Sequence, residues 1–136
     1  MEKTVTIEGL PSQEPGQRDN GKTYSIRPMK AYDGQKWVLK AMLALAKVGV
    51  EIKEELLQSI SFEDLMDPSL SPLIGNLDPD EAMELIDGLL KCVSFLPSVP
   101  NAKPVPIPTG DEVYIQEIKT RNRLAREVWE FHRAFF

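Results

Sequence analysis

The sequence predicts a mainly α domain with a small N-terminal antiparallel β-hairpin, an α+β chain built around one central apolar helix. Two short runs near the N-terminus alternate polar and apolar residues, as strands do. The run at 35–48 is apolar around most of a helix, and residues 111–136 have helical apolar spacing. A length of 136 residues, with 42% apolar and 27% charged residues, suits a single globular domain at 1–136.

Residues 1–30 are predicted to form the hairpin. The runs at 4–8 and 22–27 are β-branched or alternating, which is typical of strands, and a proline follows the second run. Residues 9–21 between them are rich in turn formers and poor in apolar side chains, which indicates a mobile loop. Because an isolated hairpin is only marginally stable, its apolar face is expected to pack on the rest of the domain.

Residues 33–93 are predicted to form a helical core. Asp33 is a candidate N-cap for a helix at 35–48, which Gly49 ends. A narrow polar stripe on this helix holds its three lysines, Lys36, Lys40 and Lys47. Nearly all its other residues are apolar, so we expect this helix to lie at the centre, wrapped by other elements.

Shorter elements are expected after the central helix. A helix is predicted at 51–60, and Ser61 begins another because Asp64 completes a capping-box pattern with it. Two prolines and a glycine limit residues 68–77 to one short turn at most.

The clearest helix start in the chain is Asp78, an N-cap residue followed by Pro79 and two acidic residues. That helix is predicted to run to about Val93. Residues 95–110 contain five prolines, which indicates an extended, polyproline-like connector rather than helix or sheet. Asp111 is then expected to open a C-terminal helix over 111–136.

The apolar residues of this C-terminal helix fall on two arcs of a helical wheel. One arc holds Ile115, Ile118, Ala125, Trp129, His132 and Phe136. The second, about 100° away, holds Leu124, Val128, Phe131 and Phe135. Two arcs suggest two packing partners, so we interpret the second as a partner-binding surface for self-assembly or for a client. The alternative, in which one core buries both arcs, stays open.

No catalytic, cofactor-binding or metal-binding site is predicted. His132 and Cys92 are the only histidine and the only cysteine, and a nucleophile pair made of the two is disfavoured because they are far apart in sequence. Asp78, Asp80 and Glu81 have the spacing of a helix start rather than that of a cation site. The sequence contains no nucleotide-binding, nucleophile-elbow or zinc-protease motif. We therefore expect that the protein is not an enzyme.

The charge pattern disfavours nucleic acid and membranes as partners. The net charge is −5, and residues 31–92 hold twelve acidic and five basic groups. The basic residues near the C-terminus alternate with glutamates, whereas nucleic-acid binders concentrate cations on one surface. No apolar run approaches the roughly 20 residues of a membrane helix. The lack of a secretory signal pattern and the single cysteine favour the cytoplasm.

Several segments resemble a family of tail assembly chaperones of tailed bacteriophages and prophages. Residues 24–31 (Tyr-Ser-Ile-Arg-Pro-Met-Lys-Ala) and 35–46 (a Lys-Trp-containing helix rich in Ala and Leu) are similar to the patterns of that family. The likeness continues at 89–93 and returns at 120–136, which ends in Phe-His-Arg-Ala-Phe-Phe.

The resemblance implies a self-associating chaperone that binds the tape measure protein and helps recruit tail tube subunits during tail morphogenesis. It also implies action in the bacterial host cytoplasm and absence from the mature virion. The alternative function is that of a helical adaptor or small transcriptional regulator of phage or prophage origin.

Overall fold

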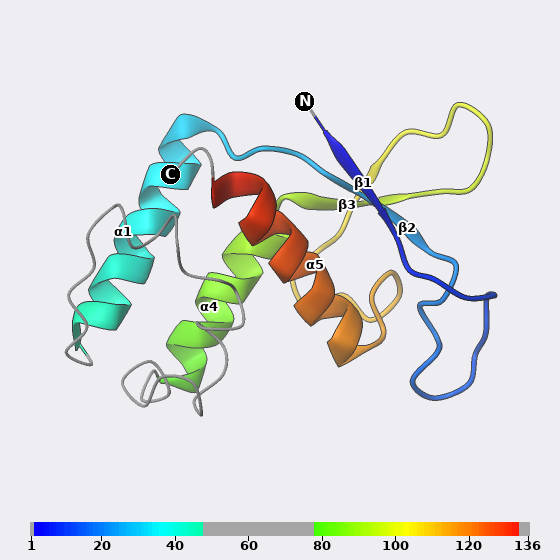
Figure 1. Ribbon diagram of the computed structural model, residues 1–136, viewed down its shortest axis with the longest axis horizontal. Helices are drawn as coiled ribbons and strands as arrows, with labels where there is room; N and C mark the ends of the chain where they lie inside the picture. Colours follow the sequence, from blue (N-terminus) through cyan, green and yellow to red (C-terminus); the bar gives the residue numbers. More distant parts are fainter. Residues whose placement is uncertain (1, 48–77, 134–136) are drawn as a thin grey trace.

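The computed structural model describes residues 2–47 and 78–133. Within these residues the fold is α+β, with three helices and a four-stranded antiparallel sheet of order β1-β2-β3-β4 (Figure 1). The elements in chain order are β1 (Lys3–Thr6), β2 (Thr23–Ile26), α1 (Ala31–Lys47), α4 (Pro79–Leu90), β3 (Val93–Leu96), β4 (Val105–Pro106) and α5 (Ile118–His132). The helices predicted at 51–60 and from Ser61, and the turn predicted at 68–77, lie outside the described residues.

The N-terminal hairpin forms as predicted. β1 pairs with β2 in antiparallel register, with Val5 opposite Tyr24. Gly21 has a φ of +85°, which a glycine adopts without strain, and its N–H donates to the carbonyl of Ile7 at 2.9 Å. Val5, Ile7, Tyr24 and the neighbouring Ile26 are all buried, so one face of the hairpin packs on the domain.

The sheet extends beyond the hairpin, and the prediction of an extended connector at 95–110 is wrong in this respect. β3 pairs with β2, with Phe95 opposite Tyr24, and β4 pairs with β3. The prolines do not prevent this, because Pro97 follows the last residue of β3 and Pro106 lies in the two-residue edge strand β4. Prolines are tolerated in edge strands and at strand ends, where no ladder N–H is required.

Helix α1 differs from its prediction in both its start and its place. It begins at Ala31, so Asp33 lies in the first turn instead of capping the helix, and the Gly34 N–H donates to the carbonyl of Lys30. Trp37 is buried, but Leu39 is 52% exposed and Leu43 is 64% exposed. Within the described residues, helix α1 is therefore not wrapped on all sides, so the prediction that other elements enclose it is wrong for this part of the chain.

Helix α4 starts where the sequence predicts. The Asp78 carboxylate accepts a hydrogen bond from the Asp80 N–H at 2.8 Å, and Pro79 occupies the first turn. The helix ends at Leu90, three residues before the predicted end, because Val93 opens β3 and is buried in the sheet.

Helix α5 begins at Ile118 instead of Asp111. The Asp111 carboxylate does act as a cap, but it accepts from the N–H groups of Val113 and Tyr114 and closes a turn there. Glu117, the N-cap of α5, makes no side-chain capping bond. The capping signal was therefore real, but it belongs to a turn rather than to a helix.

The core lies where α5 meets the sheet and α4. Helix α4 contacts both α1 and α5 (Figure 1). The completely buried apolar side chains of α5 are Leu124, Ala125, Val128 and Trp129. The Trp129 and Trp37 rings are 5.5 Å apart, which joins α1 to the same core. Among the described residues, no helix is both long enough and apolar enough to cross a membrane.

Candidate functional site

The predicted partner-binding stripe is largely inside the molecule. Leu124 and Val128 are completely buried in the core, and Phe131 is partly buried against it. Phe135 lies outside the described residues. Ile118, assigned by the sequence to the arc that docks on the domain, is instead 79% exposed. A partner could reach Leu124 and Val128 only if α5 separated from the rest of the core.

His132 and Cys92 are both held in environments that do not favour nucleophilic chemistry. The Met29 N–H donates to His132 Nε2 at 2.8 Å, and His132 Nδ1 lies 2.8 Å from the carbonyl of Val128. Nδ1 therefore carries the ring proton, and both nitrogens have partners. Burial, followed by the negative charge of Asp33, raises the pKa of the Cys92 thiol to about 11. A thiol that stays protonated at neutral pH is a weak nucleophile.

Asp19 carries a buried carboxylate that the sequence patterns did not identify as a candidate site. Its carboxylate is buried and accepts hydrogen bonds from the N–H groups of Gln116 and Glu117 and from Lys22 Nζ at 2.9–3.0 Å. Burial alone would raise the Asp19 pKa, but these hydrogen bonds outweigh it and hold the pKa below its ordinary value. Asp19 thus anchors the 9–21 loop, predicted to be mobile, to the start of α5.

A groove of about 650 Å³ lies between α1 and α4. It reaches residues 27–30, which connect β2 to α1. Its floor is formed by the buried Trp37 and the half-buried Gly88 and Cys92. A neighbouring hollow of about 190 Å³ extends toward Leu43 and shares lining residues with the first. Together the two are called the α1–α4 groove below.

Tight packing at the floor holds the two walls of the groove together. Trp37 Nε1 donates to the carbonyl of Leu85 at 2.9 Å, which ties α1 to α4. Gly88 faces the same ring, and a Cβ there would lie only 2.7 Å from Trp37 Cδ1. The absence of a side chain at Gly88 therefore lets the indole lie directly against α4.

The α1–α4 groove carries a surplus of positive charge in a chain whose net charge is −5. Its lining includes five cations, Arg27, Lys30, Lys36, Lys40 and Lys91, and four acids, Asp33, Glu81, Glu84 and Asp87. Arg27 pairs with Glu2 at 3.1 Å, and Asp87 pairs with Arg121 at 2.6 Å. The four lysines make no ion pair with any residue in 2–47 or 78–133. These ammonium groups are available to an incoming negative charge.

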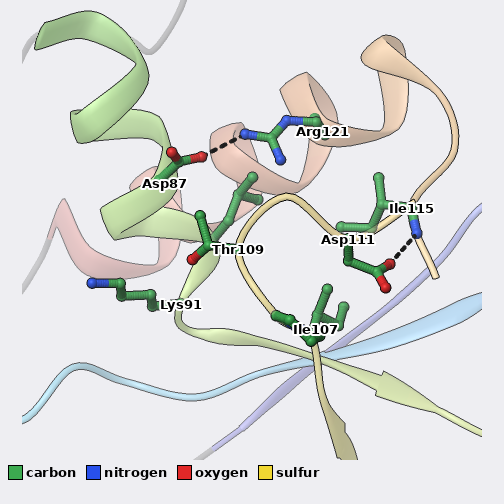
Figure 2. Close-up of a pocket in the computed structure, with 9 residues that line it drawn as sticks. Asp87, Lys91, Ile107, Thr109, Asp111, Ile115 and Arg121 are labelled. Atoms are coloured by element: carbon green, nitrogen blue, oxygen red, sulfur yellow. Dashed lines mark hydrogen bonds and ion pairs between the residues drawn. The ribbon is translucent and has the colours of Figure 1, made fainter. Parts of the chain in front are cut away.

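The Asp87–Arg121 pair also closes a second, much smaller pocket (Figure 2). This pocket of about 20 Å³ lies between α4 and the segment that leads into α5, where Ile107 and Thr109 line it. Its volume suits about one water molecule. In the part of the chain that the structure describes, no group of three or more His, Cys, Asp or Glu side chains could hold a metal ion.

No family model, no curated protein and no solved structure matches this chain. The candidate site is therefore identified from the geometry of the structure alone. The sequence identified Lys36 and Lys40 as part of a polar stripe, a signal that pointed to this groove without naming it. The contribution of α4 and Lys91 to the opposite wall could not be foreseen, because nothing in the sequence pairs α1 with α4.

Proposed function

We propose that this protein is a tail assembly chaperone of a tailed phage or prophage. In this role it binds the tape measure protein, helps recruit tail tube subunits, and self-associates in the bacterial host cytoplasm without entering the mature virion. Its work is binding rather than catalysis, and it needs no cofactor.

The observation that supports the proposal most directly is that both segments resembling tail assembly chaperones contribute residues to one groove. Arg27 and Met29, from the segment 24–31, and Lys36 and Trp37, from the segment 35–46, all line the α1–α4 groove. These segments supplied the resemblance to tail assembly chaperones, and here both border a groove of about 650 Å³. Their position fits residues selected for binding rather than for packing alone.

The apolar surface beside the groove supports the same function. Leu39 and Leu43 are exposed and lie four residues apart, so they share one face of α1. A chaperone that shields a long apolar helix needs accessible apolar surface of this kind. Exposed leucines at helical spacing therefore offer a place for a client helix to pack.

Co-expression with the tape measure protein encoded in the same genome tests the proposal. We expect the two proteins to purify together and the yield of dissolved tape measure protein to rise. An unrelated coiled-coil protein of similar length is the control and should not co-purify. Failure of the tape measure protein to co-purify under any salt condition would overturn the proposal.

The position of the gene gives an independent check. A tail assembly chaperone gene should lie between the genes for a tail tube protein and a very long tape measure protein. Salt-sensitive binding of duplex DNA without tape measure binding would instead favour the regulator.

A further inference from the structure

We infer that the α1–α4 groove is the docking site for an amphipathic helix of the client, one whose apolar stripe is flanked by acidic side chains. This inference rests on the proposed function and adds the location of the client site and the chemistry of the segment it accepts.

The shape of the groove fits a helix. Its walls are two helices that lie side by side, and a third helix can pack into the channel between two such neighbours (Figure 1). The buried Trp37 lines the groove, and Leu43 and Leu85 line its neighbouring part. An incoming apolar stripe would thus meet apolar side chains along the channel.

The charge of the groove indicates that acidic residues should flank the apolar stripe of that helix. Lys36 and Lys40 are four residues apart on α1, so they form a row along one wall, and Lys30 and Lys91 lie nearer its β2–α1 end. All four are exposed and lack ion pairs among the described residues. Carboxylates along the client helix would pair with this row, which favours an acidic partner over a basic one.

The same surface suits a protein helix better than a nucleic acid. Asp33 and Glu84 stand among the lysines, and each would repel a phosphate backbone. An acidic helix can place apolar or neutral residues opposite these carboxylates, whereas a nucleic acid carries charge at every step. The net charge of −5 adds to that repulsion.

Two synthetic helical peptides of about 20 residues test the inference on the full chain. Both carry leucines at i, i+3, i+4 and i+7; one has glutamates on its flanks and the other has lysines at the same positions. The Kd of each is measured by titration calorimetry at two salt concentrations. The wild-type chain should bind the glutamate peptide about tenfold more tightly than the lysine peptide, and added salt should narrow the gap.

Charge reversal on the groove wall locates the binding. The double variant Lys36→Glu/Lys40→Glu should raise the Kd for the glutamate peptide about tenfold, because it replaces two attractions with two repulsions. The matched control is Lys103→Glu/Lys119→Glu, which changes the charge equally at exposed lysines outside the groove and should leave the Kd unchanged. Circular dichroism confirms that each variant remains folded, and Lys36→Gln/Lys40→Gln replaces the first variant if it does not.

The outcomes separate the two proposals. Equal binding of both peptides, or equal losses in the groove and control variants, would overturn the inference even if the tape measure protein co-purifies. The inference would also be overturned if the protein bound duplex DNA more tightly than the glutamate peptide and if Lys36→Glu/Lys40→Glu abolished that DNA binding. If the peptides behave as expected but the tape measure protein does not bind, the groove chemistry stands and the proposed function fails.

Discussion

Gly88 sets the distance between α1 and α4. A Cβ at this position would lie 2.7 Å from Trp37 Cδ1 and 3.1 Å from Nε1. Gly88→Ala should therefore displace the indole, weaken its hydrogen bond to Leu85, and lower the free energy of unfolding by about 1–3 kcal/mol. Urea denaturation followed by circular dichroism measures this change.

Gly34→Ala is the matched control, since it makes the same substitution in α1. A Cβ there would meet only the Met29 Cβ, at an ordinary 3.7 Å. Alanine is favoured over glycine inside a helix, so this variant should raise the free energy of unfolding by about 0.5–1 kcal/mol. If both alanines stabilise the protein, Gly88 does not determine the spacing of the two helices.

Cys92 gives the protein an alkaline limit. Burial, with a smaller effect of Asp33, raises the pKa of this thiol to about 11, against about 8.5 in an unfolded chain. Because the unfolded state loses the proton first, the stabilisation is complete below about pH 8.5 and is lost as pH rises toward 11. Urea denaturation under reducing conditions at pH 7, 9 and 10.5 should show this decline.

Cys92→Ser removes the titrating thiol and should flatten the curve between about pH 8.5 and 10. The buried Tyr24 hydroxyl, whose pKa is also raised, mainly by burial and then by Asp19 and Asp111, affects stability only at higher pH. A serine variant that loses stability as steeply as the wild type would show that another group controls the alkaline limit.

For the elements, α5 is the clearest case of a helix whose sequence pattern has two interpretations. Leu124 and Val128 are completely buried, so Leu124→Ala should cost about 2–5 kcal/mol of unfolding free energy through lost contacts and a cavity. Ile118→Ala, on the same helix but 79% exposed, should change stability by less than about 0.5 kcal/mol. A folded, unchanged Leu124→Ala variant with weaker self-association would instead restore the partner-binding interpretation of the stripe.

Elements defined by local chemistry were predictable from the sequence, and elements defined by distant pairing were not. Asp78 predicts the start of α4 because its side chain accepts a hydrogen bond from the N–H of Asp80, only two positions away. The strand pairing of β3 depends on β2, about 70 residues earlier in the chain, so no local pattern could reveal it. The start of α5 was misplaced because an aspartate at 111 caps a turn as readily as a helix.

The candidate site follows the same rule. The lysine row of α1 is visible in the sequence as a polar stripe, and the exposed leucines appear there as apolar positions on an almost fully apolar helix. These residues of α1 form a binding groove only together with α4, which supplies the second wall. Two residues of the association stripe predicted on α5, Leu124 and Val128, lie completely buried in the core, which the helical wheel alone does not reveal.

Across the whole molecule, Asp19 joins the N-terminal hairpin loop to the C-terminal helix. Its carboxylate accepts the N–H groups of Gln116 and Glu117, next to a helix N-terminus that lacks a capping side chain of its own. Arg18 strengthens the junction by pairing with Glu117. The buried Thr120 hydroxyl also helps to lower the pKa of Asp19. Parts of the chain about 100 residues apart are thus held together by one ionised group.

This junction should make the protein sensitive to acid. Asp19 has a native pKa below the ordinary 3.8, so its stabilisation is complete above that value and is lost as pH falls through the native pKa. Asp19→Asn keeps the size but places an amide donor against backbone N–H groups, and should cost about 1–3 kcal/mol at pH 7. Because the wild-type carboxyl becomes neutral in acid, the two stability curves should converge as pH falls through the lowered native pKa of Asp19. Urea denaturation from pH 7 to pH 2.5 measures both curves, and Glu112→Gln, an exposed acid without a described partner, should run parallel to the wild type. A constant gap between wild type and Asp19→Asn at every pH would mean that the charge of Asp19 does not hold the loop to α5.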